Sequence, residues 1–368
     1  MAKDIIYEIT NENLNTGLKK IPMGHCFTSY AHPSRGMFYV GRPLAELYDW
    51  KIENVIYLLY KGREGSDLQI DVFFQDLKKR AYVDPDIINR IFSLPKMSVM
   101  DVFSFAIKLL KEKDKNEEEE VLDVIAKLPI ITAACINFHA GVGGSKIVND
   151  GSYLMNFKKM LKIPIEHEMF FKTLQLIGIL NLDLGGGSLP SFVAKKLFSS
   201  GVDIYSCLSS SILALSGNKV NAYEESSCII EDMKNVSDKD FEDELKSYLE
   251  KKGKLPSFGH PFYEIEDPIA TVLYNYAQKY FSESKLVASS LLYRKIGQKT
   301  LSGKRKFVYP NSLAITSCLF KELGFLNSHY YPVITAMFSI IGVAIQLLTD
   351  KDVKTPVFHS YYFYKARS

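Results

Sequence analysis

The chain contains a long stretch without a charged residue, YPVITAMFSIIGVAIQLL at positions 331–348, and this stretch most limits how the protein can fold. As an α-helix it would be about 27 Å long, at ~1.5 Å per residue, which is marginally enough to cross a membrane. Thr335, Ser339 and Gln346 interrupt it, its flanks show no clear positive bias, and it stands alone. We therefore expect a helix buried in a core or a dimer interface, and no membrane partner.

The composition indicates a soluble globular protein. Apolar residues make up 47% of the 368 residues and charged residues 24%, and the length allows a large domain with a smaller companion. The 45 basic and 42 acidic residues are spread along the chain, so the net charge of +3 forms no basic stripe. We therefore expect no nucleic-acid partner.

The cysteines and the N-terminus bear on the compartment. The five cysteines are widely spaced and include no CxxC pair, which argues against a disulfide framework and against a zinc site. Residues 1–13 contain no apolar run long enough for a secretory signal. These features predict a cytoplasmic protein without a bound metal.

Apolar spacing of 3.6 residues predicts that the protein is mainly α-helical. The pattern recurs at 43–62, broken near Trp50, and then at 97–113, 117–138, 166–182, 189–217, 239–253, 267–282 and 311–325. Ser98 lies where a helix should begin, and Gly217 and Gly253 lie where helices should end. Strand patterns are short and few, at 4–10, 36–41 and 306–310.

Local motifs give weak functional signals. AGVGGSKIV at 140–148 lacks the spacing of a phosphate-binding loop, and we interpret it as a surface turn. DLGGGS at 183–188 fits backbone contact with a ligand and a simple helix break equally well. The charged runs at 111–120 and 231–244 are most simply solvated, with a specific binding role as the alternative. His260, between a glycine and a proline in SFGHPFYEIEDP, is the histidine in the most distinctive setting.

Taken together, four segments between residues 36 and 355 resemble citrate synthases. They are GMFYVGRPLAELYDWKIENVIYLLYKG, LPSFGHPFYEIEDP, YPNSLAITSCLFKELGF and FSIIGVAIQLLTD, which resemble the family's opening strand and helices, its GFGHxxYxxxDPR loop, its PNVD helix and its last core helix. The resemblance implies a mainly α, two-domain homodimer that binds oxaloacetate and acetyl-CoA between the domains. We expect a large domain at 1–220 and 319–368 and a small domain at 221–318.

Several family positions with reactive side chains are occupied differently here. In the segment resembling HxDHE, Asp183 is kept and Leu184 replaces the second histidine. Val220 replaces the histidine of the GPLHG loop, which in the family stabilises the enolate. Ile269 replaces the arginine that follows the Asp-Pro pair, while His260 itself is kept.

The remaining departures affect the base and two further arginines. Asn311 is kept, but Leu313 stands where the PNVD aspartate acts as the base. The arginine of the last core helix falls between Ser339 and Gly342, with Ile340 as the assigned cleft position, and Thr355 replaces the arginine that reaches the partner subunit. General acid–base groups contribute about 10²–10⁴ in rate each, so we expect little citrate synthesis and poor oxaloacetate binding.

The resemblance leaves three hypotheses. The first is a binding, scaffold or regulatory homologue, in which His260 is a structural remnant. The second is a divergent enzyme using an acyl-CoA, in which Asp183, Asp203, Glu224 or Glu225 acts with His260. The third is an authentic but slow citrate synthase. The first two allow CoA or acetyl-CoA as a ligand, with Lys252, Lys254 and Gly259 as candidate contacts, and the protein is expected to form a homodimer or a heterodimer with an active relative.

Overall fold

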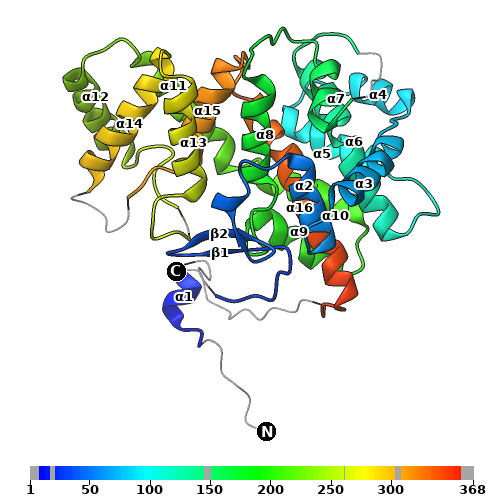
Figure 1. Cartoon of the computed structure of the whole chain (residues 1–368). Helices are drawn as coiled ribbons and strands as arrows, with labels where there is room; N and C mark the ends of the chain where they lie inside the picture. The colour runs from blue at the N-terminus through cyan, green and yellow to red at the C-terminus, as the bar shows by residue number, and fades with distance from the viewer. Residues whose placement is uncertain (1–7, 17–20, 145–150, 261, 303–307, 358–368) are drawn as a thin grey trace.

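The structure is a computed structural model, and it describes residues 8–16, 21–144, 151–260, 262–302 and 308–357, apart from the side chains of 218–220. Its first helices are α1 (Asn11–Asn15), α2 (Ile52–Lys61), α3 (Asp67–Arg80), α4 (Pro85–Phe92), α5 (Val99–Leu109), α6 (Glu117–His139), α7 (Tyr153–Met160) and α8 (Phe170–Asn181). They are followed by α9 (Leu189–Ser199), α10 (Ile204–Leu215), α11 (Asn218–Asp232), α12 (Asp238–Lys252), α13 (Pro268–Tyr280), α14 (Lys285–Leu301), α15 (Ser312–Glu322) and α16 (Tyr330–Asp352). The prediction of a mainly α protein is confirmed (Figure 1).

Helix ends follow the chemistry of the capping residues. The Ser98 hydroxyl accepts the N–H of Asp101 and begins α5, as predicted. Gly253 ends α12 in the left-handed conformation, with φ of 71°. Gly217 lies at the break between α10 and α11, and the break near Trp50 separates a 3₁₀ turn, Leu44–Glu46, from α2.

The sheet is a small antiparallel one in the order β1-β2-β3. It consists of β1 (Ser29–His32), β2 (Gly36–Tyr39) and β3 (Arg42–Pro43), and Tyr30 pairs with Phe38 across the first two strands. The strand expected at 36–41 is therefore confirmed and slightly shorter, whereas β1 was not predicted. The expected strand at 4–10 lies largely outside the described residues, and of 306–310 only an isolated bridge between Pro310 and Phe258 is described.

Two helices, α6 and α16, form the centre of the core. Both are long and apolar enough to span a membrane, but most of each lies inside the protein, and they pack against each other. The prediction that 331–348 is a buried segment is confirmed, whereas the statement that it stands alone was wrong. The sequence predicted the helix at 117–138 but not its burial, because two buried charged residues, Asp123 and Lys127, interrupt the apolar pattern.

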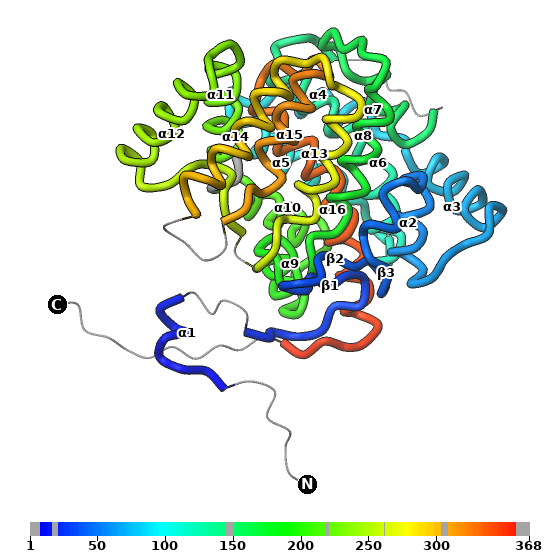
Figure 2. Tube along the Cα trace, turned by 60° about the vertical axis from the view of Figure 1, so that its left-hand side comes forward, coloured from blue at the N-terminus to red at the C-terminus, as the bar shows by residue number. Residues whose placement is uncertain are grey.

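The helices fall into two groups along the chain. Helices α11 to α15 pack chiefly against one another, and α2 to α10 pack around the two central helices, α6 and α16 (Figures 1 and 2). The predicted small domain, 221–318, corresponds to the first group, but both of its boundaries fall inside helices, α11 and α15. We place the boundaries instead between α10 and α11 and between α15 and α16, and the division into two domains stays a prediction.

Candidate functional site

Asp183 lies buried just after α8, and its carboxylate accepts four hydrogen bonds. The hydroxyls of Thr28 and Ser29 donate at 2.6 Å each, the side-chain amide of Gln346 donates at 2.8 Å, and the backbone N–H of Gly185 donates at 2.8 Å. Such donors stabilise a buried carboxylate without a cationic partner. Asp183 is therefore a junction between the segment before β2, the α8–α9 loop and α16.

The backbone around Asp183 is fixed as firmly as its side chain. The Tyr39 hydroxyl accepts the N–H of Asp183 and donates to the carbonyl of Ile179, each at 3.1 Å. Burial, followed by the charge of Asp183, raises the pKa of Tyr39. The N–H of Gly342 in α16 donates to the carbonyl of Leu182 at 2.9 Å, and a Cβ at Gly342 would lie 2.2 Å from that oxygen. Only glycine allows α16 to approach so closely.

A second group of family positions is assembled by pairing residues 257–259 with residues 309–311. The N–H of Gly259 donates to the carbonyl of Tyr309, and the N–H of Asn311 donates to the carbonyl of Ser257, both at 2.8 Å. The Asn311 side-chain amide adds a bond of 3.2 Å to the Gly259 carbonyl. The paired segments hold His260 next to the start of α15.

The His260 ring is oriented by its own loop. Its Nδ1 accepts the backbone N–H groups of Phe262 and Tyr263 at 3.1 Å each, and the ring stacks on Tyr263 with 4.4 Å between centroids. A neutral ring that accepts at Nδ1 carries its proton on Nε2, which then donates. The two backbone contacts therefore fix the tautomer of this exposed side chain.

Asp267 connects the starts of two helices. Its Oδ1 accepts the N–H of Ile269 in α13, and its Oδ2 accepts the N–H of Ser312 in α15, both at 3.0 Å. A buried carboxylate is favoured at helix N-termini by these N–H groups and by the helix dipole. The shared cap brings two predicted cleft positions, Ile269 and Leu313, into the first turns of neighbouring helices.

The hairpin of β1 and β2 contacts the loop that carries His260. The carbonyl of Pro33 accepts the N–H of Glu264 at 2.9 Å. Gly36 packs so closely against Pro268 that a Cβ there would lie 2.9 Å from the proline Cγ. Since Tyr39 of the same hairpin bonds the backbone of Asp183, the hairpin joins the Asp183 junction to the His260 loop.

The apolar replacements differ in their surroundings. Leu184, Ile269 and Leu313 are half-buried and pack against the core. Ile340 is fully buried in the middle of α16, where its side chain contributes to core packing, and its assignment as a cleft position stays a prediction. The side chain of Val220, at the start of α11, lies outside the described residues.

The three candidate CoA contacts also differ in their surroundings. Lys252 and Lys254 are exposed at the end of α12 and just beyond it. Gly259 has a φ of 84°, and both its N–H and its carbonyl bond to residues 309–311. Both backbone polar groups of Gly259 are thus already paired inside the protein, and its role as a CoA contact stays a prediction.

Thr355 lies beyond the end of α16 in a small depression of about 130 Å³, together with Lys195, Phe198, Ser199, Asp350, Lys351 and Lys354. Lys195 pairs with the buried Asp350 at 3.0 Å and donates to the carbonyl of His25 at 3.0 Å. Burial raises the pKa of Asp350, which Lys195 lowers in part. Thr355 stands where the resemblance places an arginine, and it lies beside other basic side chains.

The alternative acid–base partners of His260 are occupied or point elsewhere. Asp183 is held by its four donors, and Asp203 begins α10, where it binds Ser206 and pairs with Lys111 at 3.2 Å. Glu224 and Glu225 are exposed on α11. Burial, followed by the charge of Glu225, raises the pKa of Tyr248 in α12. These surroundings give no support to a displaced acid–base pair at these positions.

Sequence reasoning missed the donors around Asp183 and the bridging role of Asp267. Thr28, Ser29 and Gln346 carry no motif, and only their hydroxyl and amide groups, inside otherwise apolar or irregular segments, hinted at a buried partner. Among the described residues no group of three or more His, Cys, Asp or Glu could hold a metal ion.

Comparison with known proteins finds one family. The model described as "Citrate synthase, C-terminal domain" matches residues 17–356. A probable mitochondrial citrate synthase of Glossina morsitans morsitans is 24% identical over 332 residues, covering 83% of this chain and 71% of the relative. A mitochondrial 2-methylcitrate synthase of Fusarium solani is 26% identical over 341 residues, covering 83% and 71%.

Solved structures share the fold over nearly the whole chain. Citrate synthase from Thermotoga maritima MSB8 superposes with a TM-score of 0.83 at 22% identity, covering 95% of both chains. The citrate synthase of Thermoplasma acidophilum, in a ternary complex with carboxymethyl coenzyme A and oxaloacetate, superposes with a TM-score of 0.85 at 17% identity, covering 96% of both. The expected citrate-synthase-like helical fold is thereby confirmed.

Proposed function

The chain belongs to the citrate synthase family, and from this premise we propose that it no longer synthesises citrate and acts as a binding or regulatory member of that family. The observation that carries the proposal is Leu313. It occupies the first turn of α15, two residues after Asn311, where the resemblance assigns the carboxylate base. A leucine accepts no proton, so removal of a methyl proton from acetyl-CoA would lack its base.

The surroundings of Leu313 support the same proposal. Leu184, Ile269 and Leu313 are half-buried aliphatic side chains at positions where the family places polar or charged groups. A dicarboxylate entering such a site loses its hydration without gaining a cationic partner, which is unfavourable. We therefore propose that oxaloacetate binds poorly and that the protein is a pseudoenzyme.

We propose that CoA or acetyl-CoA remains a ligand, through the exposed Lys252 and Lys254. Lysine ammonium groups suit the phosphates of CoA, and neither side chain contributes to the core. Substituting both by alanine should weaken thermal stabilisation by CoA. Lys239→Ala, at the other end of the same helix, is the matched control and should leave that stabilisation unchanged.

The assembly and compartment are also proposals. We propose a cytoplasmic homodimer, or a heterodimer with an active relative whose turnover this chain modulates. Mass measurement of the purified protein tests for the dimer. Co-purification from the native host tests for the heterodimer, and recovery of homodimer alone would argue against it.

The decisive experiment measures free-thiol release from acetyl-CoA with and without oxaloacetate, beside an active citrate synthase as positive control. We expect no release that depends on oxaloacetate, and Leu313→Asp alone should not restore it because other charged positions are also replaced. Release by the unmodified protein would overturn the proposal and favour a slow authentic synthase. Restoration by Leu313→Asp would show that the base alone is missing.

A second candidate is a divergent enzyme that uses an acyl-CoA with a less charged acceptor. The tautomer of His260 favours it, because a neutral ring that accepts two N–H groups at Nδ1 carries its proton on Nε2, as a general acid would. Thiol release from acetyl-CoA without oxaloacetate would support this candidate over the first. His260→Ala should abolish that release, and the control Lys239→Ala should leave it unchanged.

A further inference from the structure

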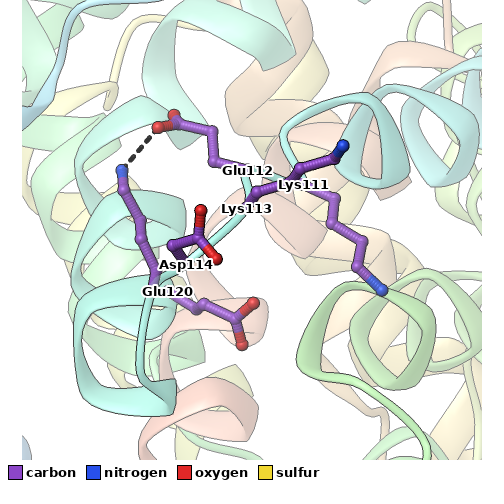
Figure 3. Close-up of a pocket in the computed structure, with 6 residues that line it drawn as sticks. Lys111, Glu112, Lys113, Asp114 and Glu120 are labelled. Atoms are coloured by element: carbon purple, nitrogen blue, oxygen red, sulfur yellow. Dashed lines mark ion pairs between the residues drawn. The ribbon is translucent and has the colours of Figure 1, made fainter.

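An open depression of about 530 Å³ lies where α5 connects to α6, and no residue assigned to the cleft above lines it. Figure 3 shows the depression with its lining side chains, Lys111, Glu112, Lys113, Asp114, Lys115 and Glu120. It coincides with the charged run that the sequence left open between a solvated surface and a binding role. The lining contains three lysines and three carboxylates, so its formal charge is balanced.

Two of the three lysines already have partners. Lys115 pairs with Glu112 at 2.7 Å and with the buried Asp123, and Lys111 pairs with Asp203 at 3.2 Å. Glu112 also accepts Lys127 at 2.7 Å. These pairs neutralise most of the lining and fix its side chains.

Glu120 differs from these paired side chains. It is nine-tenths buried in the first turn of α6, yet within the described part of the chain its carboxylate has neither a hydrogen bond nor an ion pair. Burial, followed by the negative charges of Asp203 and Glu117, raises its pKa. The side chain as a whole is nine-tenths buried, but its carboxylate oxygens are not sealed from solvent, so the carboxylate is accessible from the open depression.

A second buried polar group belongs to α10, which packs against both α5 and α6. The hydroxyl of Tyr205 in α10 is buried and makes no hydrogen bond of normal geometry within the described residues. Burial, followed by the charges of Glu120, Asp123 and Glu112, raises the pKa of Tyr205. At the rim, Lys113 is exposed and forms no ion pair with a described residue.

These groups select a class of ligand. A carboxylate accepts hydrogen bonds from an ammonium group, and a rim lysine attracts a carboxylate. A polycation would be repelled by the lysines, and a dianion by Glu120. No group of three or more His, Cys, Asp or Glu among the described residues offers a metal site.

We propose that this depression binds a free α-amino acid, with the ammonium group donating to Glu120 and the carboxylate facing Lys113. The site is independent of the cleft, so the proposal does not depend on whether the protein synthesises citrate. It adds a site for a small zwitterion to the family fold.

The test titrates the intact protein with a panel of free proteinogenic L-amino acids at millimolar concentration and follows binding by calorimetry. For any amino acid that binds, the N-acetyl derivative and the amide are then titrated, because each lacks one of the two charges. The variants are Glu120→Gln and, as matched control, Glu119→Gln. Glu119 lies in the same helical turn, and glutamine keeps its role in the capping box.

We expect the unmodified protein and Glu119→Gln to bind equally, and Glu120→Gln to bind about tenfold more weakly, since a charged hydrogen bond is lost. Both derivatives should also bind more weakly. Because Glu120 has no partner to lose, Glu120→Gln should unfold at the same or a higher temperature. The proposal is overturned if no amino acid binds, if Glu120→Gln binds as well as the unmodified protein, or if the N-acetyl derivative binds as well as the free amino acid.

Discussion

Asp183 and Glu120 are both buried carboxylates, but their surroundings are opposite. Asp183 accepts four hydrogen bonds from three segments of the chain, whereas the carboxylate of Glu120 has no partner among the described residues and lines an open depression. The first therefore stabilises the fold, and the second lowers stability unless something binds it. Burial alone does not distinguish a structural acid from a binding acid; the donors around it do.

The largest effect is expected for Asp183→Ala. The change leaves buried hydroxyl, amide and N–H donors without an acceptor, which should lower the free energy of unfolding by on the order of 4 kcal/mol. Denaturant unfolding measures it. Asp352→Ala, at the exposed end of α16, is the control and should have little effect. A loss at Asp183 as small as that of the control would remove the contrast with Glu120.

Gly342→Ala should have the next largest effect. The added Cβ would lie 2.2 Å from the carbonyl oxygen of Leu182 and 2.8 Å from Asp183, so α16 must move away from the junction. We expect a loss of about 2 kcal/mol in the free energy of unfolding. Gly187 lies in the α8–α9 loop that contains Asp183, and a Cβ there would meet nothing within 4 Å, so Gly187→Ala should be tolerated. Equal losses at both glycines would contradict the close approach of α16.

Thr28→Val removes one of the four donors and keeps the shape of the side chain. Asp183 retains three hydrogen bonds, so the expected loss in the free energy of unfolding is about 1.5 kcal/mol. Thermal unfolding beside Asp183→Ala measures the difference. A loss as large as that of Asp183→Ala would mean that the junction fails as a unit.

The smallest effect concerns the pH dependence contributed by Glu120. Its pKa is raised in the folded protein, so its contribution to stability is fully present below the ordinary value of 4.5 and is lost as pH rises through the raised value. The melting temperature of Glu120→Gln should therefore equal that of the unmodified protein at low pH and exceed it near neutral pH. Thermal scans across this range check the prediction, and a Glu120→Gln protein that melts lower at neutral pH would contradict it.

Most of the helical fold could be predicted from the sequence, because apolar periodicity and capping residues act locally. Residues 97–113 and 239–253, for example, gave α5 and α12 with the expected caps. The central position of α6 could not be predicted, since Asp123 and Lys127 resemble solvent-facing charges until Arg80, Lys115 and Glu112 are placed around them.

The candidate site was predictable only in part. Family motifs pointed to Asp183, His260, Asn311 and Leu313, and the structure brings the last three together through the pairing of 257–259 with 309–311. Sequence spacing gave no sign that Gly259 is engaged by Tyr309 or that Ile340 faces the core. Both facts depend on contacts between segments far apart in the chain, which no local pattern encodes.

The hydrogen bonds around Asp183 also constrain the order in which the protein can fold during synthesis. Thr28 and Asp183 are 155 residues apart, and Asp183 and Gln346 are 163 residues apart. Contacts of such long range form slowly, and ribosomes add only about 5–20 residues per second. The first donors can reach Asp183 when half of the chain is made, but the last is supplied near the end of translation. Until then α8 lacks its permanent neighbour in α16, and the nascent protein exposes apolar surface that the finished protein conceals.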